Sequence, residues 1–335
     1  MKTWKHCQVI AIAAIIALAL AFTACNKGGG DGGGGTGGTR STGETGGGGG
    51  KGDLQKWTVV EDSTLSVIFA IAYENNRFIA GGSNGKMAYS ANGASWTAVA
   101  DSTFGSTNSD SITNIAYGGG RWVAMGAGRA YSDDNGVTWT AVSNSGLPNS
   151  AIAYGNNRWV SVGVRGRIAY SDNGTSWTVA IPDSVGKPSI RAIAYGNNRF
   201  VAGGDYGEMA YSDDNGVTWT AVADSKFGTT RIDAIAYGNN RFVAVGGSQI
   251  AYSADGTSWT AVANSPFSTS IEGIAYGNNR FVAVADIGKI AYSDDNGVTW
   301  TAVENSGMSG IFDIAYGNNR FVAVGSGGKM AYADW

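Results

Sequence analysis

Residues 235–245 read Ile-Ala-Tyr-Gly-Asn-Asn-Arg-Phe-Val-Ala-Val, and close copies of this stretch recur along the chain of 335 residues. The tripeptide Ile-Ala-Tyr begins seven times, at gaps of 44, 37, 41, 42, 39 and 40 residues: Ile71, Ile115, Ile152, Ile193, Ile235, Ile274 and Ile314. A period of about forty residues, built from short apolar runs and turns, is typical of propeller blades. The seven copies therefore predict seven blades.

One repeat, residues 232–262, contains four segments that are suited to short strands. We expect these strands at residues 232–237, 241–245, 249–252 and 259–262. Between the first two, Gly238-Asn239-Asn240 supplies residues that tolerate the positive φ of a tight hairpin turn. Since no window shows the helical period of about 3.6 residues, the expected fold is all-β. It is a seven-bladed β-propeller of four-stranded antiparallel blades.

The two ends of the repeat region complement each other. The last copy stops after its third strand, at residues 330–335, and lacks a fourth. A matching segment stands before the first copy, because Trp-Thr-Val-Val at residues 57–60 corresponds to Trp-Thr-Ala-Val at residues 259–262. We expect residues 57–60 to complete the last blade, which closes the ring and removes an open sheet edge.

A second motif precedes the fourth strand. The sequence Ser-Asp-Asp-Asn-Gly-Val-Thr-Trp occupies residues 132–139 and recurs at 212–219 and 293–300, with versions one residue shorter at 90–96, 171–177 and 253–259. It resembles the Asp-box, or BNR repeat, and the resemblance spans residues 57–335. Asp-boxes occur in sialidases, in sortilin-type receptors and in photosystem II assembly factors, so the resemblance implies a fold more than an activity.

In that family the box aspartate is structural, which implies that Asp134, Asp214 and Asp295 brace their own turns. A calcium site is the alternative, but the spacing lacks the alternating oxygen ligands of a Ca²⁺ loop. We therefore expect no metal and no cofactor.

The N-terminal residues 1–25 have the features of an export signal. Lys2 and Lys5 precede an apolar stretch at residues 9–24, and Cys25 follows. These 16 residues are short for a membrane span, which needs about 20. The segment resembles a bacterial lipobox, although Phe22 replaces the usual Leu, and Cys25 would then carry the lipid. An uncleaved anchor and ordinary signal-peptidase cleavage are the alternatives.

Residues 26–52 contain 16 glycines and predict a flexible linker before the propeller, residues 53–335. Lipid and linker together predict a bacterial cell-envelope protein that faces the periplasm or the cell surface. Both cysteines, Cys7 and Cys25, and the single histidine, His6, lie in the signal region. The propeller therefore has no disulfide and no residues for Ser–His or Cys–His chemistry.

The formal net charge of −3 is dispersed along the chain. A dispersed, mildly acidic charge makes nucleic acid a poor candidate partner. We expect a monomer whose partner is a protein or a glycan of the cell envelope.

The repeats are uniform in some turns and individual in others. Turns after the first and third strands are nearly identical, whereas the segments after the second and fourth strands differ. These two sets lie on opposite faces, because antiparallel strands alternate in direction. Since binding sites usually occupy variable loops on a rigid scaffold, the individual face is the predicted binding face. Its candidate ligand-binding residues are Arg165, Arg167, Asp205, Tyr206, Arg231 and Asp286.

The residue that enters the third strand is also charged in most copies: Lys86, Arg129, Arg167, Glu208, Gln249, Lys289 or Lys329. Five of these seven are cationic, which predicts either a partial basic rim for an anionic partner or solvated charges that protect a strand edge.

Recurring aromatic and apolar residues are interpreted as packing. The box tryptophans are expected to be core wedges, and the inter-blade residues Leu65, Phe104, Leu147, Phe227, Phe267 and Met308 are expected to pack between neighbouring blades. Docking of protein or sugar by these residues is the alternative.

One arginine follows the first turn of every repeat: Arg77, Arg121, Arg158, Arg199, Arg241, Arg280 and Arg320. A sialidase instead needs three arginines that converge on one carboxylate, and its Phe-Arg-Ile-Pro signature is absent here. The favoured interpretation is a non-catalytic binding or assembly protein with no catalytic residues. The alternative is a sialidase-like or other glycoside hydrolase that uses acids such as Asp205, Asp233 or Asp286.

Overall fold

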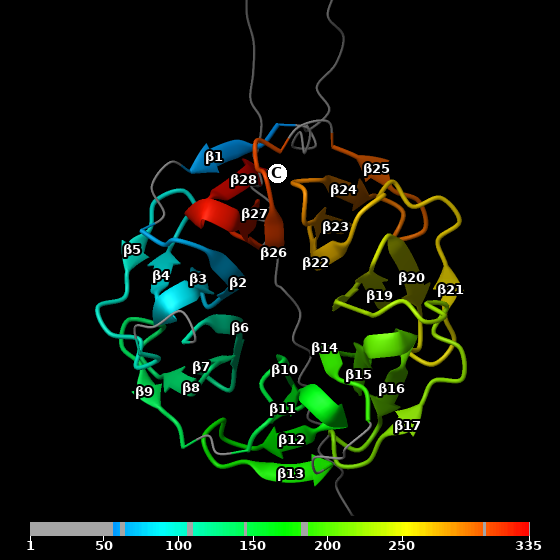
Figure 1. Cartoon of the computed structure of the whole chain (residues 1–335), viewed down its shortest axis with the longest axis horizontal. Coiled ribbons are helices and arrows are strands. Elements are labelled where there is room, and N and C mark those ends of the chain that lie inside the picture. Colours follow the sequence, from blue (N-terminus) through cyan, green and yellow to red (C-terminus); the bar gives the residue numbers. More distant parts are fainter. Residues whose placement is uncertain are drawn as a thin grey trace, which may run out of the picture. The chain divides into compact units, whose positions relative to one another are not determined.

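The computed structural model describes residues 56–60, 64–105, 110–143, 146–181, 187–303 and 306–334. In these residues, seven four-stranded antiparallel sheets stand as blades around a central channel (Figure 1). The all-β, seven-bladed propeller expected from the repeats is confirmed. The predictions for the signal at 1–25, the linker at 26–52 and Cys25 concern residues outside the described part of the chain.

Each blade is built outward from the channel, in chain order. Blade 1 comprises β2 (Ile68–Glu74), β3 (Arg77–Gly82), β4 (Met87–Ser90) and β5 (Thr97–Ala98). Blade 2 comprises β6 (Ile112–Gly118), β7 (Arg121–Gly126), β8 (Arg129–Ser132) and β9 (Thr140–Ala141). Blade 3 comprises β10 (Ala151–Gly155), β11 (Arg158–Val162), β12 (Ile168–Ser171) and β13 (Thr178–Ile181).

The other half of the ring repeats this order. Blade 4 comprises β14 (Ile190–Gly196), β15 (Arg199–Gly204), β16 (Met209–Ser212) and β17 (Thr220–Ala221). Blade 5 comprises β18 (Ala234–Gly238), β19 (Arg241–Gly246), β20 (Gln249–Ser253) and β21 (Thr260–Ala261). Blade 6 comprises β22 (Ile271–Gly277), β23 (Arg280–Ala285), β24 (Ile290–Ser293) and β25 (Thr301–Ala302).

Blade 7 joins the two ends of the described chain. It comprises β26 (Ile311–Gly317), β27 (Arg320–Gly325), β28 (Met330–Asp334) and, as its outermost strand, β1 (Thr58–Val60). Thr58 pairs with Tyr332 and Val60 with Met330, in antiparallel register. The predicted closure of the last blade by the N-terminal strand is therefore confirmed.

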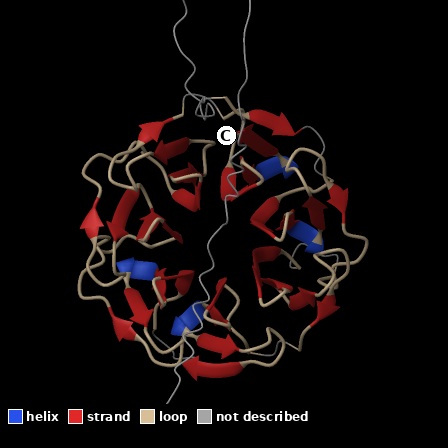
Figure 2. Cartoon of the chain, turned by 180° about the vertical axis from the view of Figure 1, so that it is seen from behind, coloured by secondary structure: helices blue, strands red, loops and turns tan. Residues whose placement is uncertain are grey.

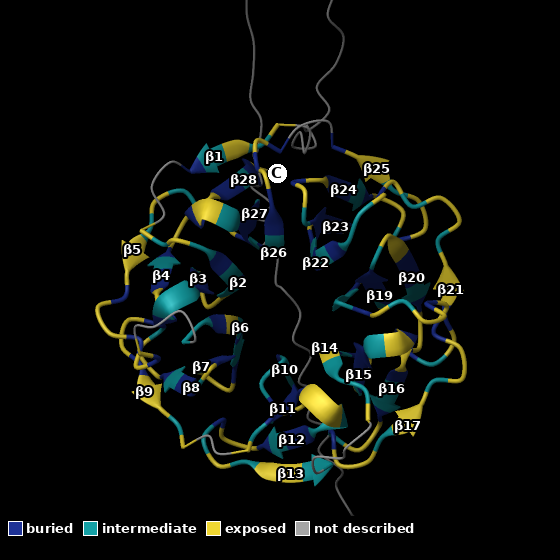
Figure 3. Ribbon diagram, viewed as in Figure 1, coloured by how far each residue is buried: buried dark blue, intermediate teal, exposed yellow. Residues whose placement is uncertain are grey.

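Burial is greatest in the second strand of each blade and least at the rim (Figure 3). The second strand of each blade is nearly all buried, as in β23, whose six residues are all buried. In contrast, β21 is two residues long and exposed. The fourth strand is shorter than the four residues predicted at 259–262, because only Thr260 and Ala261 pair with β20. An outermost strand has a neighbour on one side only, so it contributes least to the core.

The first hairpin turn explains the most regular part of the repeat. Asn239 and Asn240 have φ of 45° and 57°, the left-handed conformation that asparagine tolerates. Gly238, just before them, packs against the ring of Tyr276 in the next blade, and a Cβ there would lie 2.0 Å from Tyr276 Cγ. The Tyr-Gly pair of the repeat is thus an inter-blade contact, in which the glycine makes room for the neighbouring tyrosine.

Five of the six recurring apolar residues pack in clusters between blades, as predicted: Leu65, Phe104, Phe227, Phe267 and Met308. Leu147 is half-buried and belongs to none of these clusters. Phe227 is 1% exposed and packs in the cluster formed by blades 4 and 5. The box tryptophans also lie against the core, and the indole N–H of Trp259 donates to the carbonyl of Gly256 at 3.2 Å.

The only helical elements in the described residues are short 3₁₀ turns between second and third strands (Figure 2). They are η1 (Ser83–Gly85), η2 (Val164–Gly166), η3 (Asp205–Gly207) and η4 (Ser326–Gly328). No helix in this part of the chain is long and apolar enough to cross a membrane.

Candidate functional site

The propeller has two chemically different faces. The box face carries the turns between first and second strands and the Asp-box turns. The loop face carries the loops between second and third strands and the connections from one blade to the next. Among the described residues, the box face is built from repeated contacts, whereas the loop face carries charges that are not repeated from blade to blade.

On the box face, Asp134 shows what the box aspartate does. Its Oδ1 accepts hydrogen bonds from the backbone N–H of Val137 at 3.0 Å and of Thr138 at 2.9 Å. The Ser132 hydroxyl donates to Oδ1 at 2.8 Å, and the Thr138 hydroxyl donates to Oδ2 at 2.6 Å. Desolvation acts to raise the pKa of Asp134, but these hydrogen bonds outweigh it and lower the pKa to about 2. The carboxylate is therefore fully used in holding its own turn.

The seven arginines after the first turn also have structural partners. Each guanidinium stacks over the tyrosine of the third strand in its own blade, 3.8 to 4.8 Å from the ring centroid. In the described residues, five of them also donate to a carbonyl of the next blade's box turn: Arg77 to Asn135, Arg121 to Asn173, Arg199 to Asp255, Arg241 to Asn296 and Arg320 to Asn92. They link blades around the ring and do not converge on one point.

The candidate ligand-binding residues are on the loop face, but the structure does not bring all of them together. Arg165 and Tyr206 are the central residues of η2 and η3, with φ of 57° and 58°. Tyr206 is 67% exposed. Arg167 instead turns toward the connection between blades 2 and 3 and donates to the carbonyl of Gly146 at 2.5 Å. Asp205, Arg231 and Asp286 belong to a separate charged group.

That group lies where blades 4, 5 and 6 meet the channel. Arg191 Nε donates to Asp205 Oδ1 at 2.5 Å, and Arg231 Nε contacts Asp233 Oδ1 at 2.6 Å. Arg231 also reaches Glu272 in the next blade, with 3.6 Å between Nη2 and Oε1. With Asp286, these residues form what we call the mouth cluster: Arg191, Asp205, Arg231, Asp233, Glu272 and Asp286.

The pKa shifts of the mouth cluster indicate that its charges interact with one another. Burial raises the pKa of Glu272, and repulsion from Asp233 and from Asp286 adds to the rise. Burial also raises the pKa of Asp233, although Arg231 and Arg191 oppose it. The pKa of Asp205 is lowered, because hydrogen bonding and charge attraction from Arg191 outweigh desolvation. Charges on three consecutive blades therefore act on one another.

The sequence analysis missed two members of the mouth cluster, Arg191 and Glu272. Both are extra residues at β-bulges, because the pairing register shifts between Ile190 and Ala192 and between Ile271 and Gly273. A bulge redirects a side chain that simple strand alternation would place on a particular face of the sheet. The sequence did contain a sign of these residues, because the position two residues before each repeat isoleucine varies widely between copies. The residues at this position are Phe69, Thr113, Ser150, Arg191, Asp233, Glu272 and Phe312.

Below the mouth cluster, the channel holds a cavity of about 200 Å³ lined by the innermost strands. Six of the seven repeat isoleucines line it, together with Arg191, Asp233 and Asp313. Asp313 Oδ2 accepts from the backbone N–H of Ile71 at 2.9 Å, which joins blade 7 to blade 1. Burial raises the pKa of Asp313 to about 7, against the effect of its backbone hydrogen bonds.

Arg129 corrects the predicted rim of cationic residues. It pairs with Met125 in the register in which Met87 pairs with Gly81, so it occupies the inward apolar position of the third strand. The loop before β8 is shorter than its counterparts, which shifts the arginine inward. Arg129 is 2% exposed and stacks on Trp177, 3.9 Å from the ring centroid. Four cations, not five, therefore stand before the third strand: Lys86, Arg167, Lys289 and Lys329.

Comparison with protein families agrees with this geometry. The BNR/Asp-box repeat matches residues 130–141 and 210–221, the turns braced by Asp134 and Asp214. The DUF6242 beta propeller domain matches residues 225–334. The chain is a seven-bladed propeller that carries Asp-box repeats, called an Asp-box propeller below. No curated protein matches it in sequence.

Solved structures share the fold of this Asp-box propeller at low sequence identity. YCF48 from Cyanidioschyzon merolae is 19% identical, with a TM-score of 0.64 over 83% of this chain and 98% of that one. A YCF48 structure with bound D1 peptide is 16% identical, with a TM-score of 0.65 over 83% and 95%. The computationally designed Ika8 protein is 16% identical, with a TM-score of 0.58 over 82% and 98%.

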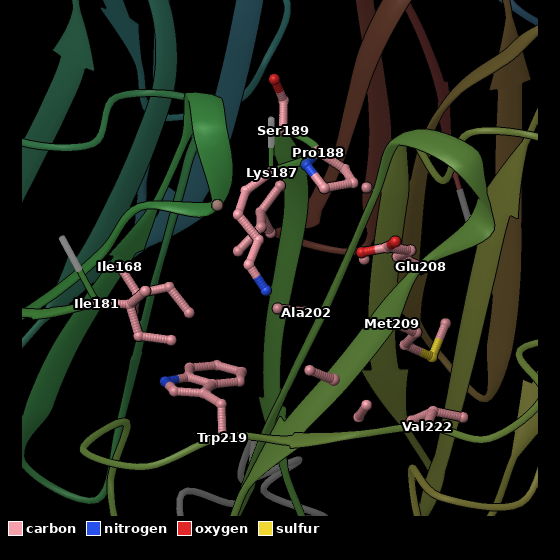
Figure 4. A pocket seen from close by; sticks show the side chains of 16 residues that line it. Ile168, Ile181, Lys187, Pro188, Ser189, Ala202, Glu208, Met209, Trp219 and Val222 are labelled. Atoms are coloured by element: carbon pink, nitrogen blue, oxygen red, sulfur yellow. The ribbon is translucent and has the colours of Figure 1, made fainter. Parts of the chain in front are cut away.

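The Asp-box propeller also has a larger cavity between blades 3 and 4, of about 460 Å³ (Figure 4). Trp219, Ile168 and Ile181 line its apolar wall, and Lys187 and Glu208 contribute charges. The connection at residues 182–186, beside Ile181 and Lys187, lies outside the described residues. The mouth cluster, in contrast, lies entirely within the described residues.

Chemically, the mouth cluster is suited to holding charged groups. In the described residues, no group of three or more His, Cys, Asp or Glu side chains is arranged to hold a metal. Of the three acids considered for a glycosidase, Asp205 and Asp233 are each paired with an arginine. Asp286 is half-buried in the loop that follows β23, where its backbone N–H donates to the carbonyl of Ser270 at 3.1 Å.

Proposed function

We propose that this Asp-box propeller is a non-catalytic scaffold that holds a protein partner on its loop face and is anchored in a bacterial cell envelope by a lipid on Cys25. The observation that carries the binding part is the mouth cluster. It places six interacting charged residues of blades 4 to 6 on one face, while the opposite face repeats the same contacts around the ring. Individual charges on a uniform scaffold are typical of a recognition surface.

A protein partner is favoured over a glycan for two reasons. The structure of YCF48 with bound D1 peptide indicates that a propeller of this shape can hold a peptide. In addition, the mouth cluster mixes cations and anions, which suits the mixed charges of a protein surface better than a uniformly anionic glycan. With four cations before the third strands instead of five, the basic rim is also a weaker feature than predicted.

The binding face can be tested by site-specific photo-crosslinking in cells. A photoreactive amino acid would replace Tyr206 on the loop face or, as the matched control, Val217 on the box face of the same blade. Both side chains are exposed. We expect a defined protein adduct, identified by mass spectrometry, from position 206 and none from position 217. Equal adducts from both positions, or none from 206, would contradict the proposal.

Lipid anchoring needs its own test, because it rests on the sequence of residues 1–25. Growth with an alkyne fatty acid should label the wild-type chain, and Cys25→Ser should remove the label and release the protein from the membrane fraction. A wild-type chain that takes up no label would contradict the anchor and leave the binding proposal intact.

The enzyme alternative can be separated by assaying the purified chain on fluorogenic sialosides and glycosides. We expect no turnover. Turnover that a single substitution such as Asp286→Asn abolishes would replace the scaffold proposal with a glycoside hydrolase.

A further inference from the structure

The mouth cluster contains more carboxylates than arginines. It contains four carboxylates, Asp205, Asp233, Glu272 and Asp286, but only two arginines, Arg191 and Arg231. Each arginine is engaged with an aspartate, Arg191 with Asp205 and Arg231 with Asp233. Glu272 has a hydrogen bond from Ser270, but the nearest charge that neutralises it is Arg231 at 3.6 Å. The excess lies on blades 5 and 6.

Two carboxylate oxygens in this excess have no hydrogen-bond partner among the described residues. They are Asp233 Oδ2 and Asp286 Oδ1, and both atoms are buried. The Asp233 side chain is only 8% exposed, yet Asp233 lines the channel cavity of about 200 Å³. A buried carboxylate oxygen without a donor is costly, so its position beside an open cavity points to a donor supplied from outside.

The next two blades around the ring carry aromatic residues at the mouth. Phe69 and Phe312 occupy, in blades 1 and 7, the bulge position that Glu272 occupies in blade 6. Their rings stack with centroids 5.8 Å apart, and both residues are half-buried. A flat apolar pair beside a group of carboxylates suits the long alkyl stem and charged end of a basic side chain.

We propose that the channel mouth receives an arginine or lysine side chain of the protein partner, whose charged end reaches Asp233, Glu272 and Asp286. This inference rests on the proposed function and adds the chemistry of the contact. Such a side chain supplies several N–H donors and positive charge, which match the unpartnered oxygens and the uncompensated carboxylates. Asp313 of blade 7 lines the same cavity and adds a further acceptor within the channel.

The channel offers its own reporters for a test. The δ1 methyl groups of the repeat isoleucines can be labelled in the full-length chain and followed by NMR. The probe is the peptide acetyl-Gly-Gly-Arg-Gly-Gly-amide, and the matched neutral probe carries citrulline in place of arginine. We expect saturable shifts of the Ile235 and Ile274 methyls with the arginine peptide, and none of Ile79, which is buried away from the channel in β3.

Charge should decide the affinity. The citrulline peptide should bind at least about tenfold more weakly, since hydrogen bonds to a charged group are worth about 1.5–3 kcal/mol and 1.4 kcal/mol corresponds to tenfold. Glu272→Gln and Asp286→Asn should each weaken the arginine peptide by a similar factor. Asp213→Asn is the matched control, because this substitution also removes one carboxylate and one ion pair, with Arg199, but does so on the box face. Dispersed methyl spectra would show that each variant is folded.

Failure of this inference can be distinguished from failure of the proposed function. Equal binding of the arginine and citrulline peptides, or unchanged binding by both Glu272→Gln and Asp286→Asn, would overturn the cationic contact. The photo-crosslink at position 206 would then be repeated in a chain that carries both Glu272→Gln and Asp286→Asn. If the yield of the adduct is unchanged in that chain, the proposed scaffold function is supported and the cationic contact is overturned. Loss of the adduct in that chain but not in Asp213→Asn would support it.

Discussion

The guanidinium of Arg320 donates from Nη1 to the backbone carbonyl of Asn92 at 2.6 Å, across 228 residues of sequence. Arg320 belongs to the last blade and Asn92 to the box turn of the first. The same guanidinium stacks on Tyr332 and pairs with Asp334. One side chain therefore connects the seam at which the ring closes to the body of its own blade.

Substitution at this position should weaken the seam. We expect Arg320→Ala to lower the free energy of unfolding by about 2 kcal/mol, because a charge-assisted hydrogen bond and a cation–π contact are lost together. Arg158→Ala is the matched control. Arg158 has the equivalent tyrosine and an aspartate, but in the described residues it has no bond to a carbonyl of the next blade. Urea unfolding of both variants would test this, and equal losses would contradict a special role for the seam.

The closing strand itself should be indispensable. Deleting residues 56–61 removes β1 and exposes the edge of β28, so we expect the propeller to lose its cooperative unfolding transition. Calorimetry would measure this, with a deletion of equal length in the glycine-rich segment, residues 36–41, as the control. A deletion of residues 56–61 that keeps the full melting temperature would mean that β1 does not close the ring.

The repeats predicted the fold because each level of the sequence agreed with the next. Spacing predicted the blade number, Asn-Asn turns predicted the hairpins, and the unmatched end segments predicted the pairing of β1 with β28. The candidate site was predicted less well. Arg191 and Glu272 stand at bulges, where strand alternation no longer tells which face a side chain occupies. Arg129 was misplaced because the shorter loop of blade 2 alters its register. The geometry of these loops could not be predicted from the repeat, because the copies differ in sequence and length at the loops.

Acid should weaken the box turns. Hydrogen bonds lower the folded-state pKa of Asp134 to about 2 from its ordinary 3.8. A lowered pKa contributes stability that is present above the unfolded value and is lost as pH falls from about 4 toward 2. After allowance for solvent screening, we expect about 1 kcal/mol from this residue at pH 7.

Two blades provide a natural comparison, because Asn92 and Asn173 accept the same backbone bonds in their turns without titrating. Asp134→Asn should therefore fold and should flatten the fall in unfolding free energy between pH 4 and pH 2, as measured by urea unfolding. An unchanged pH profile would argue against the bracing carboxylate.

Asp313 should have the opposite pH dependence. Burial raises its folded-state pKa to about 7 from its ordinary 3.8, so the penalty for its charge is absent below the unfolded value, grows as pH rises toward about 7, and is constant above it. Asp313→Asn should gain stability over the wild type by about 1–2 kcal/mol between pH 5 and pH 8. Asn114 stands naturally at the equivalent position of blade 2, so the substitution should be tolerated. A difference in unfolding free energy between Asp313→Asn and the wild type that does not change with pH would contradict the raised pKa.

Arg129 should be a stability cost. Its Nε and Nη1 are buried without a hydrogen-bond partner among the described residues, and burial lowers its pKa to about 9. Met87 and Met330 occupy the equivalent position in other blades. We therefore expect Arg129→Met to stabilise the propeller by about 1–2 kcal/mol, since replacing a buried charge that has no anionic partner by an apolar side chain outweighs the loss of its Nη2 bonds to Pro148 and Ser161. Arg129→Ala, which also loses the contact with Trp177, should destabilise it. Destabilisation by both would indicate that the charge itself is needed.

The pairing of β1 with β28 has a mechanical consequence. The other strands of blade 7 follow one another along the chain, whereas β1 is held to β28 only by non-covalent contacts, among them three residue pairs from Thr58–Tyr332 to Val60–Met330. A force applied to the N-terminal end of the chain reaches the pair Thr58–Tyr332 first. The three pairs then separate one after another, in the unzipping geometry. Pulling on that end should release β1 at low force before any other blade yields.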